Sequence, residues 1–339
     1  MRSDSAPKAV YVQSNEQAGN QLLAFRCGPD GALSSTDSVP TGGSGDGTAH
    51  LPSQGSLTVT GDGRAVLVTN AGSGDVSAFA VDGHRLGTTA SGSIPRSVTE
   101  HDGLVYVLNT GDPSVCGFRL GAGGLEPIAG STRALDEGSD PAQVGFSPDG
   151  SALVVTERMA NAIVSYPVGA DGQLGEPHSR SSSGQTPYGF AFTDDGTLMV
   201  VEAFGAAKGK AATSSYATAG SDVTPVSASV PNGRSEICWA VVSADNRFLY
   251  TTNFADSGVS RYAIGDDGSL TLDDAAAGVG IDGHTGLRDE DLTADGHFLY
   301  ALDADSHQVF GWSVADNGSL SAIGSWGRLP DTAAGLAAT

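Results

Sequence analysis

Two glutamates each close an otherwise apolar run of the sequence, and a carboxylate in that setting can do acid–base chemistry. Glu157 ends the run Ala152-Leu-Val-Val-Thr-Glu157, and Glu202 ends the run Leu198-Met-Val-Val-Glu202. Burial disfavours the charged form of a carboxyl group, which raises its pKa and suits it to act as a general base. We therefore predict Glu202 and Glu157 as catalytic residues. The alternative is that each is an ordinary hydrogen-bond acceptor at the end of a strand.

Two arginines complement these carboxylates. Arg96 and Arg288 can each bind a carboxylate or an oxyanion through two parallel N–H donors. Opening a lactone by hydrolysis needs such a donor for the developing oxyanion and a base that activates water. We predict Arg288 as catalytic and Arg96 as substrate-binding. The alternative is that both arginines pair with the acidic run Asp289-Glu-Asp291.

A repeat of turns and strands must position these residues. Each unit contains an Asp-Gly-type turn, then an apolar run, then an alternating segment, as in residues 147–150, 152–157 and 162–168. The turn aspartates lie 40 to 50 residues apart, at Asp62, Asp102, Asp149, Asp195, Asp245 and Asp295. This period, with several short strands in each unit, is typical of the blades of a β-propeller.

The two ends of the chain together supply a seventh unit. Residues 9–13 and 21–25 look like second and third strands without a first, and residues 329–338 look like a first strand without the others. We therefore predict an all-β, seven-bladed β-propeller closed by pairing of the N- and C-terminal strands, which removes the exposed sheet edge. We expect residues 8–339 to form one domain, residues 1–7 to be a disordered tail, and residues 204–222 to be a surface loop after the strand that ends at Glu202.

In a propeller, the first strand of each blade lines the central channel, and loops at one mouth build the binding site. Residues six positions before a turn aspartate are therefore predicted to face the channel, and they include Gln143, Trp239 and Asp289. We predict these three, with the neighbouring Tyr188, as substrate-binding residues. Trp239 can stack on a flat ligand, and the alternative is that it packs in the core.

Two of the seven histidines precede predicted first strands and can face the channel mouth. His50 and His284 are therefore further substrate-binding candidates. The sequence contains no closely spaced histidine pair, no C-x-x-C pair and no G-x-S-x-G or phosphate-binding glycine motif. These absences predict no metal site, no cofactor and no serine-hydrolase elbow.

The composition excludes several partners. Lys+Arg number 17 against 39 Asp+Glu, a net charge of -22, so nucleic acid is not an expected partner and anionic substrates are repelled. No run approaches 18 apolar residues, so no membrane-spanning helix is expected. The first residues contain no apolar stretch typical of a signal peptide, so we expect a cytoplasmic monomer, with export left open.

Several motifs resemble a known family. The turn Ser147-Pro-Asp-Gly150, the run Phe248-Leu-Tyr250 and the closing Gly335-Leu-Ala-Ala338 resemble the seven-bladed propeller lactonases. That family includes the propeller-type bacterial 6-phosphogluconolactonases and the fungal carboxymuconate lactonizing enzymes. The resemblance covers nearly the whole chain, but its motifs belong to the blade scaffold.

The chain departs from that family at the site. The phosphogluconolactonase branch has a Gly-Pro-Arg-His segment at the start of one inner strand, and the matching segment here is Thr186-Pro-Tyr-Gly189. A histidine of the preceding blade in that branch is matched by the segment Pro141-Ala-Gln143. These replacements, together with the negative charge, argue against phosphogluconate as the substrate.

The resemblance and the candidate residues together imply an enzyme that opens, closes or isomerises a small neutral lactone or cyclic ester at the channel mouth, without a cofactor. Whether the chain is catalytic stays open at this stage. One alternative is a non-catalytic propeller that binds a small molecule or a protein, and another is a biosynthetic isomerase or cyclase on the same scaffold.

Overall fold

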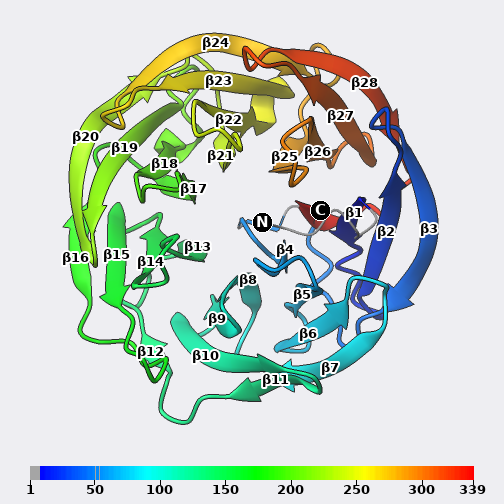
Figure 1. Cartoon of the computed structure of the whole chain (residues 1–339), viewed down its shortest axis with the longest axis vertical. Coiled ribbons are helices and arrows are strands. Elements are labelled where there is room, and N and C mark those ends of the chain that lie inside the picture. The colour runs from blue at the N-terminus through cyan, green and yellow to red at the C-terminus, as the bar shows by residue number, and fades with distance from the viewer. Residues whose placement is uncertain (1–7, 50, 53) are drawn as a thin grey trace.

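Seven antiparallel sheets are arranged in a ring, as Figure 1 shows, in a computed structural model that describes residues 8–49, 51–52 and 54–339. Each sheet is one blade, with its first strand at the centre of the ring and its fourth at the rim. The seven-bladed, all-β prediction is therefore confirmed. No helix in the described part of the chain is long and apolar enough to cross a membrane.

The first four blades have the following strands, listed from the centre outward. Blade 1 contains β29 (Ala334–Ala338), β1 (Ala9–Gln13), β2 (Gln21–Cys27) and β3 (Leu33–Pro40). Blade 2 contains β4 (Leu57–Val59), β5 (Ala65–Asn70), β6 (Asp75–Ala80) and β7 (Arg85–Ala90). Blade 3 contains β8 (Pro95–His101), β9 (Leu104–Asn109), β10 (Ser114–Gly121) and β11 (Gly124–Pro127), with β12 (Arg133–Ala134) also paired to β10. Blade 4 contains β13 (Pro141–Phe146), β14 (Ala152–Glu157), β15 (Ala162–Pro167) and β16 (His178–Ser181).

The remaining three blades follow the same order. Blade 5 contains β17 (Pro187–Phe192), β18 (Leu198–Glu202), β19 (Ala212–Ala219) and β20 (Asp222–Pro231). Blade 6 contains β21 (Ile237–Val242), β22 (Phe248–Asn253), β23 (Gly258–Ile264) and β24 (Leu270–Val279). Blade 7 contains β25 (Leu287–Leu292), β26 (Phe298–Asp303), β27 (Gln308–Val314) and β28 (Leu320–Trp326). Two short 3-10 helices, η1 (Phe204–Ala206) and η2 (Phe254–Asp256), follow β18 and β22.

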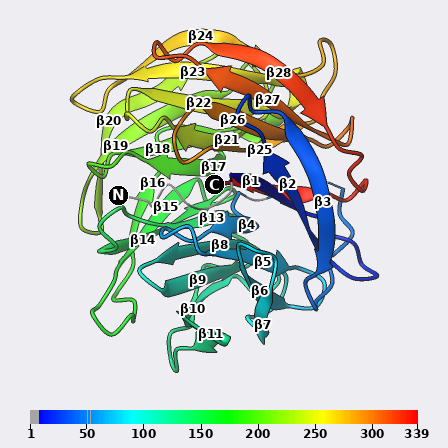
Figure 2. The same ribbon diagram turned by 45° about the vertical axis from the view of Figure 1, so that its right-hand side comes forward.

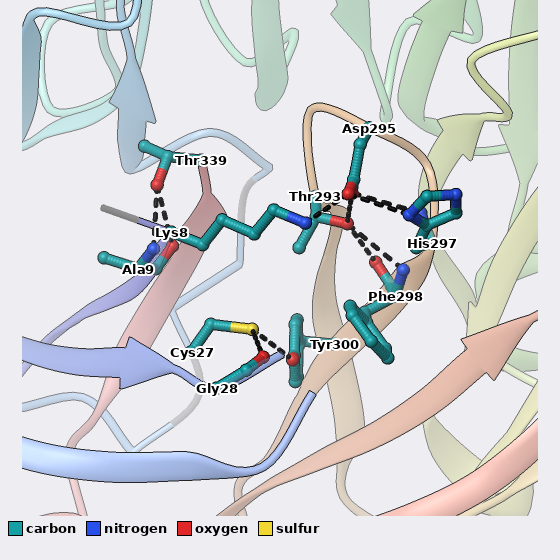
Figure 3. A network of polar contacts seen from close by, with 10 residues as sticks. All are labelled: Lys8, Ala9, Cys27, Gly28, Thr293, Asp295, His297, Phe298, Tyr300 and Thr339. Atoms are coloured by element: carbon teal, nitrogen blue, oxygen red, sulfur yellow. Dashed lines mark hydrogen bonds and ion pairs between the residues drawn. The ribbon is translucent and has the colours of Figure 1, made fainter. Parts of the chain in front are cut away.

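The ring closes as predicted, by pairing of the C-terminal strand with the N-terminal one. Strand β29 runs antiparallel to β1, with Val10 opposite Ala338 and Val12 opposite Leu336, and the red C-terminal segment lies beside β1 in Figures 1 and 2. Lys8 adds an ion pair from the start of β1 to Asp295 of blade 7, drawn in Figure 3. Without β29, the edge of β1 that faces the centre of the ring would have no strand partner.

A Ser/Thr-x-Asp pattern explains why the turn motif recurs. Ser147 donates its hydroxyl to Asp149 at 2.7 Å, and the same carboxylate accepts the N–H of Ser151 at 3.0 Å. Gly150 follows with φ 68°, a left-handed conformation that glycine adopts without strain. The same hydroxyl-to-aspartate bond occurs at Asp62, Asp245 and Asp295. The aspartate therefore holds the hairpin between the first and second strands of a blade.

The expected loop over residues 204–222 is wrong beyond its beginning. After η1 the chain forms β19, whose residues 212–216 are all buried, and β20 follows after a tight turn. The strand has no apolar pattern, yet its small polar residues can be buried because they find hydrogen-bond partners inside the blade. Ser214, for example, donates to the carboxylate of Glu202 at 2.5 Å. A buried partner for a serine is invisible to hydrophobic periodicity.

Candidate functional site

A buried polar residue ends the second strand of every blade. These residues are at most 3% exposed: Gln13, Asn70, Asn109, Glu157, Glu202, Asn253 and Asp303. Asn253, for example, binds both the neighbouring strand and the connection that leads to the inner strand: it donates to Ser260 at 2.9 Å and accepts from Asn232 at 2.9 Å. The repetition in seven blades indicates that this position ties the loops to the sheet.

Glu202 follows this structural pattern. Its carboxylate accepts the Gly184 N–H at 2.7 Å and the hydroxyls of Ser214 and Ser229, all within blade 5 and its connections. A carboxylate held by several donors inside one blade has no free access to a substrate in the channel. The geometry therefore does not support the predicted role of Glu202 as a general base, and the strand-end alternative describes it better.

Glu157 occupies the same position in blade 4. Burial raises the pKa of its carboxyl group, although the hydroxyl of Ser139 opposes this. Glu157 does not line the channel cavity described below. The structure therefore separates both predicted glutamates from the channel, and their catalytic role is not favoured.

Arg288 and Asp289 form an ion pair at the start of β25. The guanidinium of Arg288 is 0% exposed, and its Nε lies 3.7 Å from Oδ2 of Asp289, which is 3% exposed. Arg288 donates through Nη2 to the Ala333 carbonyl at 2.5 Å, whereas its Nε and Nη1 have no hydrogen-bond partner among the described residues. A buried pair with unfilled donors is costly for folding, so it points to a functional site.

A β-bulge determines where the Asp289 side chain lies. Arg288 pairs with Leu302 and Glu290 with Ala301, so Asp289 is the extra residue of β25 and has φ 22°. Its carboxylate accepts the Gly335 N–H from β29 at 3.1 Å. Comparable bulges occur at the start of four other inner strands: β8, β13, β17 and β21. Bulges of this kind redirect side chains near sites.

The pKa of Asp289 is shifted into the range of a general base. Burial raises it from 3.8 to about 6, against the lowering effects of Arg288, the Gly335 N–H and Trp239. The group is therefore mostly ionised at pH 7 and able to accept a proton. Burial also lowers the pKa of Arg288, which the charge of Asp289 opposes.

Two aromatic side chains lie beside this pair. The rings of Tyr188 and Trp239 are 5.7 Å apart, and both residues are at most 5% exposed. The Tyr188 hydroxyl has no hydrogen-bond partner among the described residues. Arg158 covers the other side of Tyr188, with its guanidinium 5.0 Å from the ring centre, and is held by Asp140 at 2.6 Å.

A cavity of about 250 Å³ follows the inner strands and is lined by Gln54, Gln143, Trp239, Asp289, Glu290 and Asp291, among others. No lysine, arginine or histidine of the described chain lines it. Glu290 is 5% exposed, both of its carboxylate oxygens have no hydrogen-bond partner among the described residues, and burial raises its pKa well above the usual value. The cavity wall is thus acidic or neutral.

The other predicted site residues are dispersed. Gln143 lines the cavity, but its amide pairs with the backbone N–H and C=O of Phe190 in blade 5, at 2.6 and 3.1 Å. Arg96 pairs with Asp46 at 3.2 Å rather than with the acidic run of β25. His284 is exposed in the connection before β25, and His50 lies outside the described residues.

Sequence reasoning missed Gln54 and Glu290. Gln54 lies in the long connection before β4, where no strand pattern marks it. Glu290 follows Asp289 in an acidic run that looks like a solvated surface. Among the described residues, no three His, Cys, Asp or Glu side chains are grouped as metal ligands.

Comparison with known proteins agrees with this architecture. The family model described as "Lactonase, 7-bladed beta-propeller" matches residues 6–206 and 202–332. The periplasmic gluconolactonase of Pseudomonas aeruginosa is 18% identical with a TM-score of 0.76, over 98% of this chain and 99% of its own. A putative 6-phosphogluconolactonase from Bacteroides fragilis is 19% identical with a TM-score of 0.73, over 100% of both chains.

A search of curated protein sequences found no significant match. The structural neighbours, at these identities, support the fold alone, whereas the family model spans nearly the whole chain. The protein therefore belongs to the lactonase family of seven-bladed β-propellers.

Proposed function

We propose that this protein hydrolyses a small, uncharged lactone in the channel cavity, with Asp289 as the general base. The observation that carries the proposal is a cavity-lining carboxylate with a pKa of about 6, paired with a fully buried arginine. Membership of the lactonase family and the gluconolactonase-like fold neighbours support lactone hydrolysis in general.

The chemistry follows from this arrangement. Asp289 takes a proton from water as the water oxygen attacks the lactone carbonyl carbon. When the ring C–O bond breaks, the proton passes to the leaving alkoxide, so the product is a hydroxy acid and Asp289 is regenerated. Arg288 acts through Asp289 as a positioning residue, since it does not line the cavity. Asp289, which the sequence predicted as substrate-binding, is thus the proposed catalytic residue, and Arg288, which it predicted as catalytic, is a positioning residue.

Charge favours a neutral substrate. Asp289 and Asp291 line the cavity beside Glu290, whose raised pKa favours its neutral form, and the whole chain carries a net charge of -22. An anionic ligand is repelled by this wall, whereas a neutral lactone is not. The product ionises to a carboxylate after ring opening, so the same wall favours its release.

The test is a panel of uncharged γ- and δ-lactones with proton release as the readout. We expect turnover by the wild type, a loss of about 10²–10⁴-fold in Asp289→Asn, and none of that loss in the folded fraction of Glu202→Gln. Equal rates in wild type and Asp289→Asn would remove Asp289 from the mechanism. No turnover of any lactone would instead favour the non-catalytic alternative.

A further inference from the structure

The side chain of Gln54 reaches across the central channel. Gln54 precedes β4 of blade 2, but its Nε2 donates to the Ala240 carbonyl of blade 6 at 3.0 Å, and the Ala240 N–H donates to its Oε1 at 3.1 Å. Blades 7 and 1 separate these two blades on one side of the ring, and blades 3, 4 and 5 separate them on the other. The contact therefore joins opposite walls of the channel.

Gly189 of blade 5 provides the space for this contact. A Cβ atom at position 189 would lie 2.1 Å from Oε1 of Gln54 and 2.4 Å from the Cys238 carbonyl oxygen. Any side chain at 189 would therefore displace the Gln54 carboxamide. Gln54 lines the same cavity as Trp239 and Asp289, so the carboxamide lies in the proposed site.

The contact differs from the other glutamine contact in the channel. Gln143 makes the same pair of bonds to Phe190, but across the seam between two adjacent blades, where it continues normal packing. The Gln54 carboxamide instead binds the backbone of β21, in a blade that is not adjacent to its own. That strand would otherwise present the unpaired N–H and C=O of Ala240 to the cavity.

We propose that the N–H and C=O of Ala240 form a ligand subsite for a cyclic cis-amide, which Gln54 occupies in the resting protein. A primary carboxamide presents a C=O and an N–H side by side, and a lactam ring presents the same two groups in the same relation. A lactone of equal ring size can accept the hydrogen bond of the Ala240 N–H through its carbonyl. Its ring oxygen has no hydrogen to donate, however, so the Ala240 carbonyl is left without a donor. Gln54 therefore determines which ligands enter, and lactams bind more tightly than lactones.

This inference rests on the proposed function only for the reaction at the site, because binding at Ala240 can be measured without turnover. The experiment titrates wild type and Gln54→Ala with 2-piperidone, with N-methyl-2-piperidone as the probe that lacks the N–H. Calorimetry and ligand-observed NMR report the affinity. Gln173→Ala is the matched control, since Gln173 is half-buried, does not line the channel cavity, and its side chain donates a single bond to the Ala129 carbonyl.

We expect Gln54→Ala to bind 2-piperidone at least tenfold more tightly than wild type or Gln173→Ala does. We expect the same variant to bind N-methyl-2-piperidone about five- to tenfold more weakly than it binds 2-piperidone, because one hydrogen bond is lost. If Gln54→Ala does not fold, Gln54→Ser serves, and the lactam must raise its unfolding midpoint. Equal affinities for the two probes, or no gain over wild type, would overturn the subsite. Lactam binding without lactone turnover in any variant would keep the subsite and refute the proposed hydrolysis.

Discussion

Asp289→Asn tests whether the buried Arg288–Asp289 pair is kept for function or for stability. The pKa of Asp289 rises on folding from 3.8 to about 6 because of burial. A carboxyl group whose pKa is higher in the folded state stabilises the fold fully below its unfolded pKa and loses that contribution as the pH rises through the folded pKa. The ionised group therefore lowers the free energy of unfolding by about 3 kcal/mol above pH 6.

An asparagine removes this penalty and keeps an acceptor for the Gly335 N–H. We predict that Asp289→Asn is more stable than wild type by about 3 kcal/mol at pH 8, and that this gain is smaller at pH 5, where the Asp289 carboxyl group is mostly protonated. Urea unfolding followed by tryptophan fluorescence, at matched pH, measures the difference. Asp245→Asn is the control, because hydrogen bonds to Asp245 lower its pKa despite partial burial, so that variant loses stability at pH 8.

A loss of stability in Asp289→Asn would have the opposite meaning. Removing one partner of a structural buried ion pair usually costs about 3–5 kcal/mol, because the other charge is left uncompensated. If Asp289→Asn loses stability on this scale at pH 8, the pair holds the fold together and the argument for a strained functional carboxylate is refuted.

Three further predictions rest on single contacts and a fourth on the net charge. Glu202→Gln places an amide against donors that now bind a carboxylate, so its unfolding free energy falls by about 2–3 kcal/mol in urea titrations. Gly189→Ala overlaps Gln54 and the Cys238 carbonyl, so it loses about 1–3 kcal/mol in the same assay. Lys8→Met removes a partly exposed ion pair and costs under about 1 kcal/mol at pH 7. Burial raises the pKa of Asp295, but the Lys8 bond helps to hold it well below 3.8, so that cost begins to shrink below about pH 4 and is lost as the pH falls towards the lowered pKa. Raising KCl from about 0.1 to 1 M shortens the Debye length from about 10 to 3 Å and screens the net charge of -22, so the thermal midpoint rises in calorimetry.

The repeat made the fold predictable from the sequence. The turn aspartates, with their Ser or Thr partner two residues earlier, mark the same hairpin in blades 2, 4, 6 and 7. The split unit at the two chain ends predicted the closing pair of β29 and β1. Strand β19 was missed because its buried residues are serine and threonine, which carry no apolar pattern.

The candidate site was predicted only in part. Counting from the turn aspartates found Gln143, Trp239 and Asp289, which do line the cavity. The direction in which each side chain points depends on bulges, which a count of residues does not reveal. At Asp289, the bulge makes this residue the extra one in β25, whereas Glu290 keeps a partner on β26. The strand-end glutamates looked catalytic because a sequence cannot show that Gly184 and Ser214 both donate hydrogen bonds to the Glu202 carboxylate. Gln54 binds a residue 186 positions away in the sequence, so no local sequence pattern could predict this contact.

The pH dependence of lactone hydrolysis tests the central claim most directly. For the lactone that the wild type turns over best, kcat/KM is measured from pH 4.5 to 8 for wild type and Asp289→Asn. If Asp289 is the general base, the wild-type profile rises with pH and has its midpoint near the Asp289 pKa of about 6, and the variant has no such rising limb. A wild-type rate that does not change over this range, or a variant with the same rising limb, would contradict this role.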